Sequence, residues 1–202
     1  MTPQPAPNPP TSPRAARSRE KMIRAATDLL VESGPRGVTV DAVAECSGVA
    51  KSTLYRHWSS RDEMLIDVVR CNVPDLEQPD LTLGFTAALR AHVASLVETL
   101  IDPEWSRIIP AMMALRTTMP DLAAVVESDR DVKAGALAAI LDLGVAEGFD
   151  VGDVDAHDAM MLLVGPLVFA SILGEQDRLP ALADQVVDRF IDSARAGTRT
   201  AP

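Results

Sequence analysis

The chain has 202 residues, of which 47% are hydrophobic and only 3% aromatic, and its net charge is −10. This length permits one substantial hydrophobic core, or a small and a larger core packed together. The two cysteines, Cys46 and Cys71, follow no CxxC or CxxH spacing, so neither a zinc site nor a disulfide framework is indicated. Free thiols favour a reducing compartment.

No segment has the pattern of a membrane span or a secretion signal. The longest uncharged run, residues 159–174, contains Gly165 and Pro166 and is shorter than the roughly 20 apolar residues that a spanning helix needs. The amino terminus, MTPQPAPNPP, has no apolar signal core. We therefore expect a soluble, cytoplasmic protein that is not exported and does not contact a membrane.

Charge is distributed unevenly along the chain. Residues 1–70 carry a net charge of +2, whereas residues 71–202 carry −12. The overall acidity therefore does not exclude nucleic-acid binding, because the excess acid lies outside the first third. Any surface for a polyanion is expected within residues 1–70.

The first 13 residues include six prolines and no charged side chain. Such a segment cannot build a core, and we expect a disordered tail over residues 1–13. A basic run follows at once: Arg14, Arg17, Arg19, Lys21 and Arg24. Two interpretations of this run stay open, a solvated helix start or an arm that lies along a phosphate backbone.

Helical patterns fill the remainder of the first third. Apolar residues recur at helical spacing over about 18–33, and Gly34 and Pro35 end that helix. Thr39 can cap a short second helix. The buried side of that helix is expected to hold Val40, Val43 and Ala44. Asp62 and Glu63 open a further helix.

Between these helices lies the segment GVAKSTLYRHW, which starts at Gly48. We expect Gly48 to take a positive φ and so to turn the third helix sharply away from the second. Leu54 and Trp58 are four residues apart and share the inward face. The outward face carries only cations and hydroxyls: Lys51, Ser52, Tyr55 and Arg56. This arrangement predicts a helix-turn-helix unit whose second helix reaches into a DNA groove.

The run TVDAVAECSGVAKSTLYRHWSSRDEML resembles the amino-terminal signature of the TetR/AcrR family of transcriptional regulators. The resemblance covers roughly residues 18–65 without gaps, and its Leu-Tyr-x-His-aromatic core is specific. Four positions depart from the family pattern: Ala50 replaces Ser, Ser52 replaces Gly, Trp58 replaces Phe and Arg61 replaces Lys. We expect Ala50 to leave the start of the third helix without a side-chain cap.

The resemblance implies a role in DNA binding for particular residues. It implies phosphate contacts by Thr39, Lys51, Tyr55, His57 and Arg61. It implies base reading by Thr53 and Arg56, with help from Ser52. The chemistry agrees, because a phenol or an ammonium donates to phosphate oxygens, whereas an arginine fork can bond guanine at two points. His57 has an alternative role as a half-buried partner of a backbone carbonyl.

After a polar connector at 73–80, helical patterns continue to the end of the chain. They span about 82–101, 103–117, 120–147, 153–173 and 179–196. No strand alternation competes, so we expect an all-α fold. It comprises an amino-terminal three-helix helix-turn-helix DNA-binding domain over 14–72 and a larger helical effector-binding and dimerisation domain over 81–198.

The stretch 159–174 is apolar on every side of a helix, so such a helix must be buried all round. The last helix offers a matching stripe: Leu182, Val186, Val187, Phe190 and Ile191. We infer a two-fold homodimer with two helices from each subunit at its interface, and the resemblance implies the same. Two recognition helices one turn apart would read a palindromic operator in double-stranded DNA.

The resemblance also implies a cavity for a small-molecule effector in the middle helices. Those helices carry Phe85, Leu89, His92, Leu96, Trp105, Ile109, Met112, Met113 and Met119. Methionines and aromatic residues suit an adaptable pocket, although an ordinary core explains most of them equally well. The preferred candidates for ligand contacts are Trp105, Met112, Met113 and Arg116.

Catalytic or metal chemistry finds little support. The acids and histidine at 153–158 match no calcium or zinc motif and suit the start of a helix. We expect no enzyme activity, no metal and no cofactor. The leading hypothesis is a dimeric repressor released from its operator by a small effector. The alternatives are a helical enzyme or small-molecule-binding protein that retains the helix-turn-helix, and an architectural DNA binder without an effector.

Overall fold

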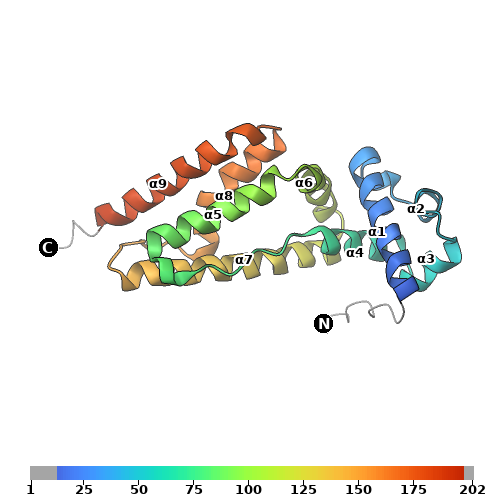
Figure 1. Ribbon diagram of the computed structural model, residues 1–202, viewed down its shortest axis with the longest axis horizontal. Coiled ribbons are helices and arrows are strands. Elements are labelled where there is room, and N and C mark those ends of the chain that lie inside the picture. Colours follow the sequence, from blue (N-terminus) through green and yellow to red (C-terminus); the bar gives the residue numbers. More distant parts are fainter. Residues whose placement is uncertain (1–12, 198–202) are drawn as a thin grey trace. The chain divides into compact units, whose positions relative to one another are not determined.

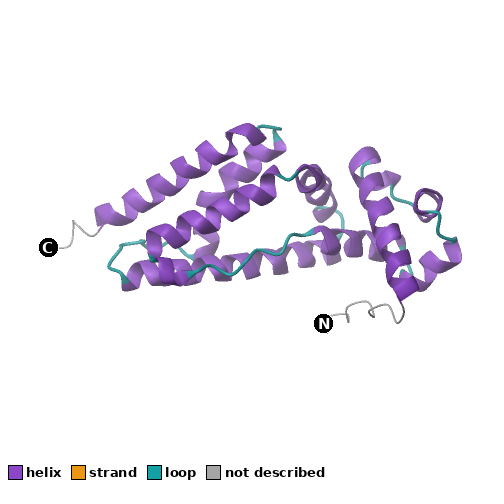
Figure 2. Cartoon of the chain, in the orientation of Figure 1, coloured by secondary structure: helices purple, strands orange, loops and turns teal. Residues whose placement is uncertain are grey.

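The computed structural model describes residues 13–197, and every regular element in that range is helical (Figures 1 and 2). The α-helices are α1 (Pro13–Ser33), α2 (Val40–Ser47), α3 (Lys51–His57), α4 (Arg61–Asn72), α5 (Phe85–Ile101), α6 (Pro103–Arg116), α7 (Pro120–Ala146), α8 (Ala156–Ile172) and α9 (Leu179–Gly197). Short 3₁₀ turns lie at η1 (Pro35–Gly37), η2 (Leu81–Leu83) and η3 (Gln176–Arg178). The all-α prediction is confirmed. The expected disordered tail lies outside the described residues except for Pro13.

The helix boundaries follow local capping chemistry. The α8 helix starts at Ala156, later than the apolar pattern predicts, because the Oδ1 atom of Asp155 accepts from the backbone N–H of Asp158 at 2.8 Å. The acids that precede α8 therefore include a cap, as the sequence indicates. At the other end of the chain, α1 starts at Pro13 rather than near residue 18. The basic run from Arg14 to Arg24 consequently lies on a helix.

The contacts divide the chain into two compact units. The amino-terminal unit contains the described residues up to Val73 together with Pro110–Val125. The carboxy-terminal unit contains Pro74–Ile109 and the described residues from Val126 onward. The segment 110–125, which sequence patterns place in the larger domain, thus groups with the helix-turn-helix. This segment includes the end of α6 and the start of α7.

The core of the amino-terminal unit forms where α1 packs against α2 and α4. Its buried side chains include Met22, Ala26, Leu30, Val43, Leu54, Trp58, Met64, Leu65, Val68 and Val69. A fully buried side chain of this kind contributes about 1.5–3 kcal/mol relative to an exposed one. The short helices α2 and α3 are therefore held by packing, since helices of their length are not stable alone.

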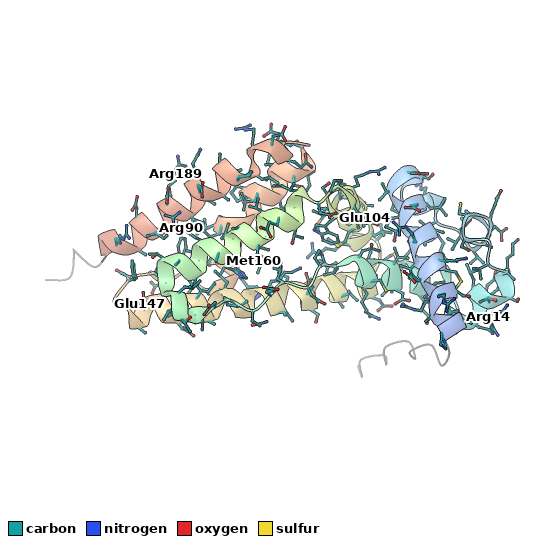
Figure 3. The ribbon with its side chains drawn as sticks, in the orientation of Figure 1. Arg14, Arg90, Glu104, Glu147, Met160 and Arg189 are labelled. Carbon is teal, nitrogen blue, oxygen red and sulfur yellow. The ribbon has the colours of Figure 1, made fainter. Side chains whose placement is uncertain are left out.

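The core of the carboxy-terminal unit is built by α5, α8 and α9, with α7 adding a buried face (Figure 1). Its largest fully buried side chains are Phe85, Leu89, Ile140, Leu163 and Leu167. A Cβ atom at Gly144 would lie 2.8 Å from the Phe85 ring, so glycine is needed there. Arg90 of α5 also pairs with Asp188 of α9 (Figure 3 labels Arg90).

The expectation that the apolar stretch 159–174 is buried all round is not met within one chain. One face of α8 enters the core through Ala159, Leu163, Leu167 and Ala170. The opposite face leaves large apolar side chains exposed: Met161, Leu162, Phe169, Ile172 and Leu173. The described residues of a single copy of the chain do not cover this face.

Cys46 on α2 and Cys71 on α4 are both free and exposed. Within residues 13–197, no helix combines the length and the apolar character that crossing a bilayer requires.

Candidate nucleic-acid interface

Residues at the helix ends set the direction of α3. The Oγ1 atom of Thr39 accepts from the backbone N–H of Ala42 at 3.1 Å and caps α2, as predicted. Gly48 ends α2 with φ 67° and ψ 19°, the left-handed conformation expected of it. Ala50 precedes α3 and makes no side-chain cap, also as predicted. The tight turn between α2 and α3 is therefore a property of these few residues.

The inner face of α3 anchors the helix in the amino-terminal unit. Leu54 is buried and Trp58 is only 3% exposed, which confirms the predicted orientation. The Nε1 atom of Trp58 donates to Oδ2 of Asp67 at 2.9 Å, and a terminal nitrogen of Arg19 donates to the same oxygen at 2.6 Å. One buried carboxylate thus joins α1, α4 and the residue that follows α3.

Sequence reasoning missed Asp67 and its two partners. A signal was present, because Asp67 falls between Met64 and Val68 on the apolar side of α4. An acid on such a face is expected to have a buried partner. The sequence does not say that the partners are Trp58 and Arg19.

The outer face of α3 presents its polar groups to solvent. Lys51, Ser52, Tyr55 and Arg56 are exposed, and Tyr55 reaches 61% exposure. Thr53 is half-buried, and its Oγ1 atom accepts from a terminal nitrogen of Arg56 at 3.4 Å. The described residues of the amino-terminal unit therefore leave the side chains of Lys51, Ser52, Tyr55 and Arg56 uncovered. Such a face can donate hydrogen bonds to phosphates and to base edges.

Lys51 has a neighbour that the sequence did not single out. Its Nζ atom lies 2.7 Å from Oδ1 of Asp41 in the first turn of α2. The hydrogen bond and charge of Asp41 raise the pKa of Lys51, so the ammonium stays charged. A phosphate that approaches Lys51 has to compete with the Asp41 carboxylate.

His57 is half-buried at the end of α3, and its ring lies 5.8 Å from that of Trp58 between centroids. Burial lowers the pKa of His57, and the positive charges of Arg19 and Arg56 lower it further. The ring is consequently neutral at pH 7 and can donate one N–H. No hydrogen bond from His57 to a backbone carbonyl occurs within the described residues, so its alternative role finds no support.

Arg61 is engaged within the protein. Its Nε atom donates to the carbonyl of Val38 at 2.8 Å, and a terminal nitrogen donates to the carbonyl of Pro35. These bonds fix the η1 turn that precedes α2. A phosphate contact by Arg61 stays a prediction and falls to the remaining donors of the guanidinium.

The basic run at the start of the chain lies on α1. Arg19 is tied to Asp67, whereas Arg14, Arg17, Lys21 and Arg24 are exposed (Figure 3 labels Arg14). These exposed cations belong to a helix rather than to an extended arm. A phosphate contact by any of them stays a prediction.

The four candidate ligand contacts do not form a cluster within one unit. Trp105 is half-buried in the carboxy-terminal unit, whereas the other three lie in the segment of α6 that groups with the amino-terminal unit. Met112 is buried, and Met113 and Arg116 are exposed. Their role in effector binding stays a prediction.

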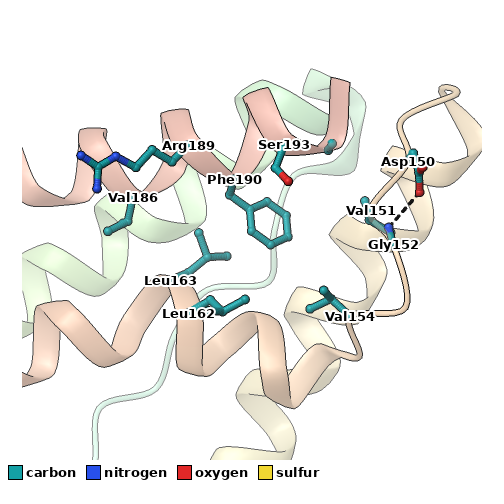
Figure 4. Close-up of a pocket in the computed structure, with 11 residues that line it drawn as sticks. Asp150, Val151, Gly152, Val154, Leu162, Leu163, Val186, Arg189, Phe190 and Ser193 are labelled. Atoms are coloured by element: carbon teal, nitrogen blue, oxygen red, sulfur yellow. Dashed lines mark hydrogen bonds between the residues drawn. The ribbon is translucent and has the colours of Figure 1, made fainter. Parts of the chain in front are cut away.

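Two cavities are bordered by described residues of the carboxy-terminal unit, and none of those four residues lines either. One is an open groove of about 730 Å³ between α8, α9 and the loop before α8 (Figure 4). Phe190, Val186 and Leu162 form much of its apolar wall, and Arg189 lies at its side. The other is a small, partly open cavity of about 40 Å³ between α5, α7 and α8, bordered by His92 and Lys133.

The capped α2, the left-handed glycine and the exposed basic face of α3 together define a helix-turn-helix DNA-binding protein. Comparison with known families agrees. Residues 22–68 match the model described as bacterial regulatory proteins, tetR family. Residues 80–190 match the tetracyclin repressor-like C-terminal domain. The chain belongs to the TetR family of DNA-binding transcriptional regulators, which is not an enzyme family.

Individual relatives are distant but span most of the chain. YdeS of Bacillus subtilis, an uncharacterised HTH-type regulator, is 27% identical over 184 residues, which cover 89% of this chain and 86% of YdeS. The repressor KstR2 of Rhodococcus jostii is 27% identical over 81% of each chain. Among solved structures, the flavonoid-responsive regulator FrrA shares the fold with a TM-score of 0.67 at 23% identity, over 89% of this chain and 97% of FrrA.

Proposed function

We propose that this protein is a homodimeric transcriptional repressor that leaves a palindromic operator when a small-molecule effector binds. The observation that carries the proposal is the division of α3 into two faces. Leu54 and Trp58 hold the helix from behind, while Lys51, Tyr55 and Arg56 extend into solvent. A rigidly held helix with an exposed cationic face suits insertion into a major groove.

The exposed groups divide by chemistry into two roles. Lys51, Tyr55 and the neutral His57 donate to phosphates, together with Thr39 at the start of α2 and the remaining donors of Arg61. Arg56 reads base edges, because its planar fork can bond guanine twice, and Thr53 and Ser52 assist. Phosphate contacts set the affinity and base contacts set the sequence preference.

A second copy of the chain covers the exposed apolar face of α8. That face holds Phe169, Leu162 and Met161, and the groove beside α9 continues it (Figure 4). Apolar patches of this kind on a water-exposed helix pair indicate a protein interface. A two-fold axis through the α8 and α9 faces also supplies the pair of α3 helices that a palindrome requires.

Two parts of the proposal, that the protein represses transcription and that it responds to a small molecule, are inferred from its relatives. KstR2 is named a repressor, and FrrA is described as flavonoid-responsive. By analogy, this chain represses in the cytoplasm and responds to a small molecule. The effector favours a conformer whose α3 helices are wrongly spaced, which needs a differential affinity of roughly 1–3 kcal/mol or more.

Selection of bound duplexes from a random DNA pool tests the proposal. The expected result is an inverted repeat with half-sites about one helical turn apart, or a multiple of it. Recovery of no sequence preference would support the architectural alternative. Recovery of a single half-site would contradict the dimer. Turnover of a small molecule without DNA retention would support the enzyme alternative.

A further inference from the structure

The helix α3 has few anchors of its own. It contains seven residues, it has no side-chain cap at Ala50, and Leu54 is its one buried side chain. An apolar contact is non-directional, so Leu54 holds α3 against the unit without fixing how the helix is turned about that point. A second anchor is needed to set the direction in which the outer face of α3 points.

The second anchor is Trp58, which directly follows α3. Its backbone N–H donates to the carbonyl of Leu54 at 2.9 Å, so the residue is joined to the last turn of the helix. Its indole Nε1 atom donates to Oδ2 of Asp67 at 2.9 Å, and both side chains are almost fully buried. A hydrogen bond weakens steeply when it is bent. This bond therefore fixes the indole, and with it the last turn of α3, relative to α4.

The carboxylate that accepts this bond is itself held in place. A terminal nitrogen of Arg19 on α1 donates to the same oxygen at 2.6 Å, and the Asp67 side chain is only 4% exposed. If the carboxylate turned, both donors would lose their acceptor, and a buried polar group without a partner is costly. Asp67 on α4 thus ties α1 to the end of α3 (Figure 1 shows these three helices).

Base reading depends on the orientation of α3 more than phosphate contact does. Arg56 lies two residues before Trp58, and its exposed side chain is the proposed base reader. Hydrogen bonds to base edges need a geometry held within about 0.5 Å and 10–20°. The flexible side chain of Lys51 can follow a phosphate by rotating about its own bonds. Loss of the Trp58 anchor should therefore reduce discrimination between sequences before it reduces general affinity for DNA.

We propose that Asp67 and Arg19 are positioning residues for sequence recognition, which act through Trp58 and set how strongly the protein prefers its operator over other DNA. The inference rests on the proposed reading of bases by α3. Asp67 is buried and Arg19 is engaged with it, so neither side chain needs to contact DNA. The Phe of the family signature has no donor, and the anchor is consequently a property of this chain.

The test compares two affinities for each variant of the full chain, one for the selected operator and one for a duplex of equal length with scrambled half-sites. The ratio of the two affinities measures discrimination. Trp58→Phe keeps the packing but removes the donor, and should lower the ratio about fivefold. Asp67→Leu removes the acceptor and should lower the ratio about tenfold. Asp67→Asn retains an acceptor oxygen and should stay within about twofold of the wild type.

Arg19→Met separates positioning from phosphate contact. Because it removes the bond that holds Asp67, this variant should lower the ratio about threefold. The slope of log K against log salt should stay at its wild-type value, since the guanidinium meets Asp67 and not a phosphate. A shallower slope with an unchanged ratio would make Arg19 a phosphate contact and overturn its positioning role.

A control distinguishes positioning from stability. A variant that is only less stable has a smaller folded fraction, which lowers its affinity for every duplex by the same factor and leaves the ratio unchanged. Thr27 accepts a hydrogen bond from Asn72 at 2.9 Å, so this pair also joins α1 to α4, but it does not reach α3. Thr27→Val should therefore be less stable than the wild type and keep the wild-type ratio.

Nuclear magnetic resonance tests the anchor without DNA. The chain has two tryptophans, so the indole N–H signal of Trp58 is assigned by its loss in Trp58→Phe. Asp67→Leu should shift this signal and speed its exchange with solvent. Half-buried Trp105 in the other unit is the internal reference, and its signal should not move.

The outcomes separate this inference from the proposed function. A wild-type ratio of one would overturn both, because α3 would then read no bases. A high wild-type ratio that Trp58→Phe and Asp67→Leu both keep would overturn this inference alone. The same conclusion follows if Thr27→Val lowers the ratio as much as they do, or if Asp67→Leu leaves the indole signal of Trp58 unchanged.

Discussion

The indole nitrogen of Trp58 lies 2.9 Å from a carboxylate oxygen of Asp67, and both residues are almost fully buried. Arg19 donates to the same oxygen. In the family signature this aromatic position is Phe, which has no donor. In this chain the larger residue adds a hydrogen bond that fixes the end of α3 against α4 and α1.

Removal of the Asp67 carboxylate is expected to destabilise the amino-terminal unit. Asp67→Ala leaves Trp58 and Arg19 without their acceptor and should lower the free energy of unfolding by about 3 kcal/mol. Trp58→Phe keeps most of the packing and should lower it by about 1 kcal/mol. Urea unfolding followed by circular dichroism measures both values. Asp62→Ala, an exposed acid on the same helix, is the control, and an equal loss there would contradict the assignment.

Two substitutions on α3 separate phosphate contact from base reading. Tyr55→Phe should weaken binding to all sequences about equally, whereas Arg56→Ala should also relax base preference. A dimer that neutralises roughly eight phosphates should give a slope of about −7 for log K against log salt. Fluorescence anisotropy with operator and mismatched duplexes measures these quantities. A slope near zero, or an unchanged preference in Arg56→Ala, would be inconsistent with the roles assigned.

Asp41 restrains the DNA affinity of its neighbour. Asp41→Asn removes the negative charge that pairs with Lys51 and should strengthen DNA binding about threefold at low salt. The gain should shrink as salt rises, because salt screens exposed charges. The same anisotropy titration in two salt concentrations provides the measurement. Glu45→Gln, an exposed acid later in α2, is the matched control, and a similar gain there would show only a general charge effect.

The exposed face of α8 should control the oligomeric state. Phe169 is 63% exposed in the single chain, and Phe169→Glu places a charge where the partner copy is expected. Sedimentation velocity at micromolar concentration should then give a monomer in place of a dimer. Val132→Glu alters a side chain on α7 that is 66% exposed and should leave the dimer intact. A wild-type monomer would refute the dimer itself.

His92 should make stability depend on pH. The unfolded chain binds a proton near pH 6.5, whereas the folded chain binds it only at lower pH because burial lowers the pKa of His92. Stability contributed by neutral His92 is therefore present above pH 6.5 and is lost as pH falls towards the folded pKa. In His92→Leu the loss below pH 6.5 should be smaller by up to about 1.4 kcal/mol per pH unit.

Urea titrations from pH 7 to pH 5 test this expectation. His57 also has a lowered pKa and contributes a similar slope in every variant, so the comparison with wild type isolates His92. If His92→Leu keeps the full slope, burial does not lower the pKa of His92 in the folded protein.

Prediction from the sequence succeeded for structural features that neighbouring residues determine. The Thr39 cap depends on a residue three positions away, and the Gly48 turn depends on the glycine itself. Prediction from the sequence failed for side-chain contacts between residues that are far apart in the chain. Arg61 donates to a carbonyl 23 residues away, and Arg19 binds an acid 48 residues away. No periodicity encodes such pairs, because two helix faces meet only in the folded chain.

The cavity between α5, α7 and α8 could not be predicted from the sequence either. Methionines suit a pocket wherever they occur, so composition did not favour Met160, which borders the cavity, over Met112, which is buried in the other unit. In the sequence, His92 falls among the apolar residues of the middle helices, and nothing there distinguishes it as a cavity residue. That no described residue forms a hydrogen bond with His92 became visible only with its neighbours in place.

The exposed thiol of Cys46 makes one measurement accessible without adding a residue. A nitroxide label at Cys46, with Cys71→Ser to remove the other free thiol, sits on α2 beside the turn into α3. In a dimer the two labels form a single pair, so their dipolar coupling reports the separation of the two recognition helices directly. That distance, recorded in frozen solution with and without operator or ligand, would show how far the two recognition helices move apart or together when the protein leaves DNA.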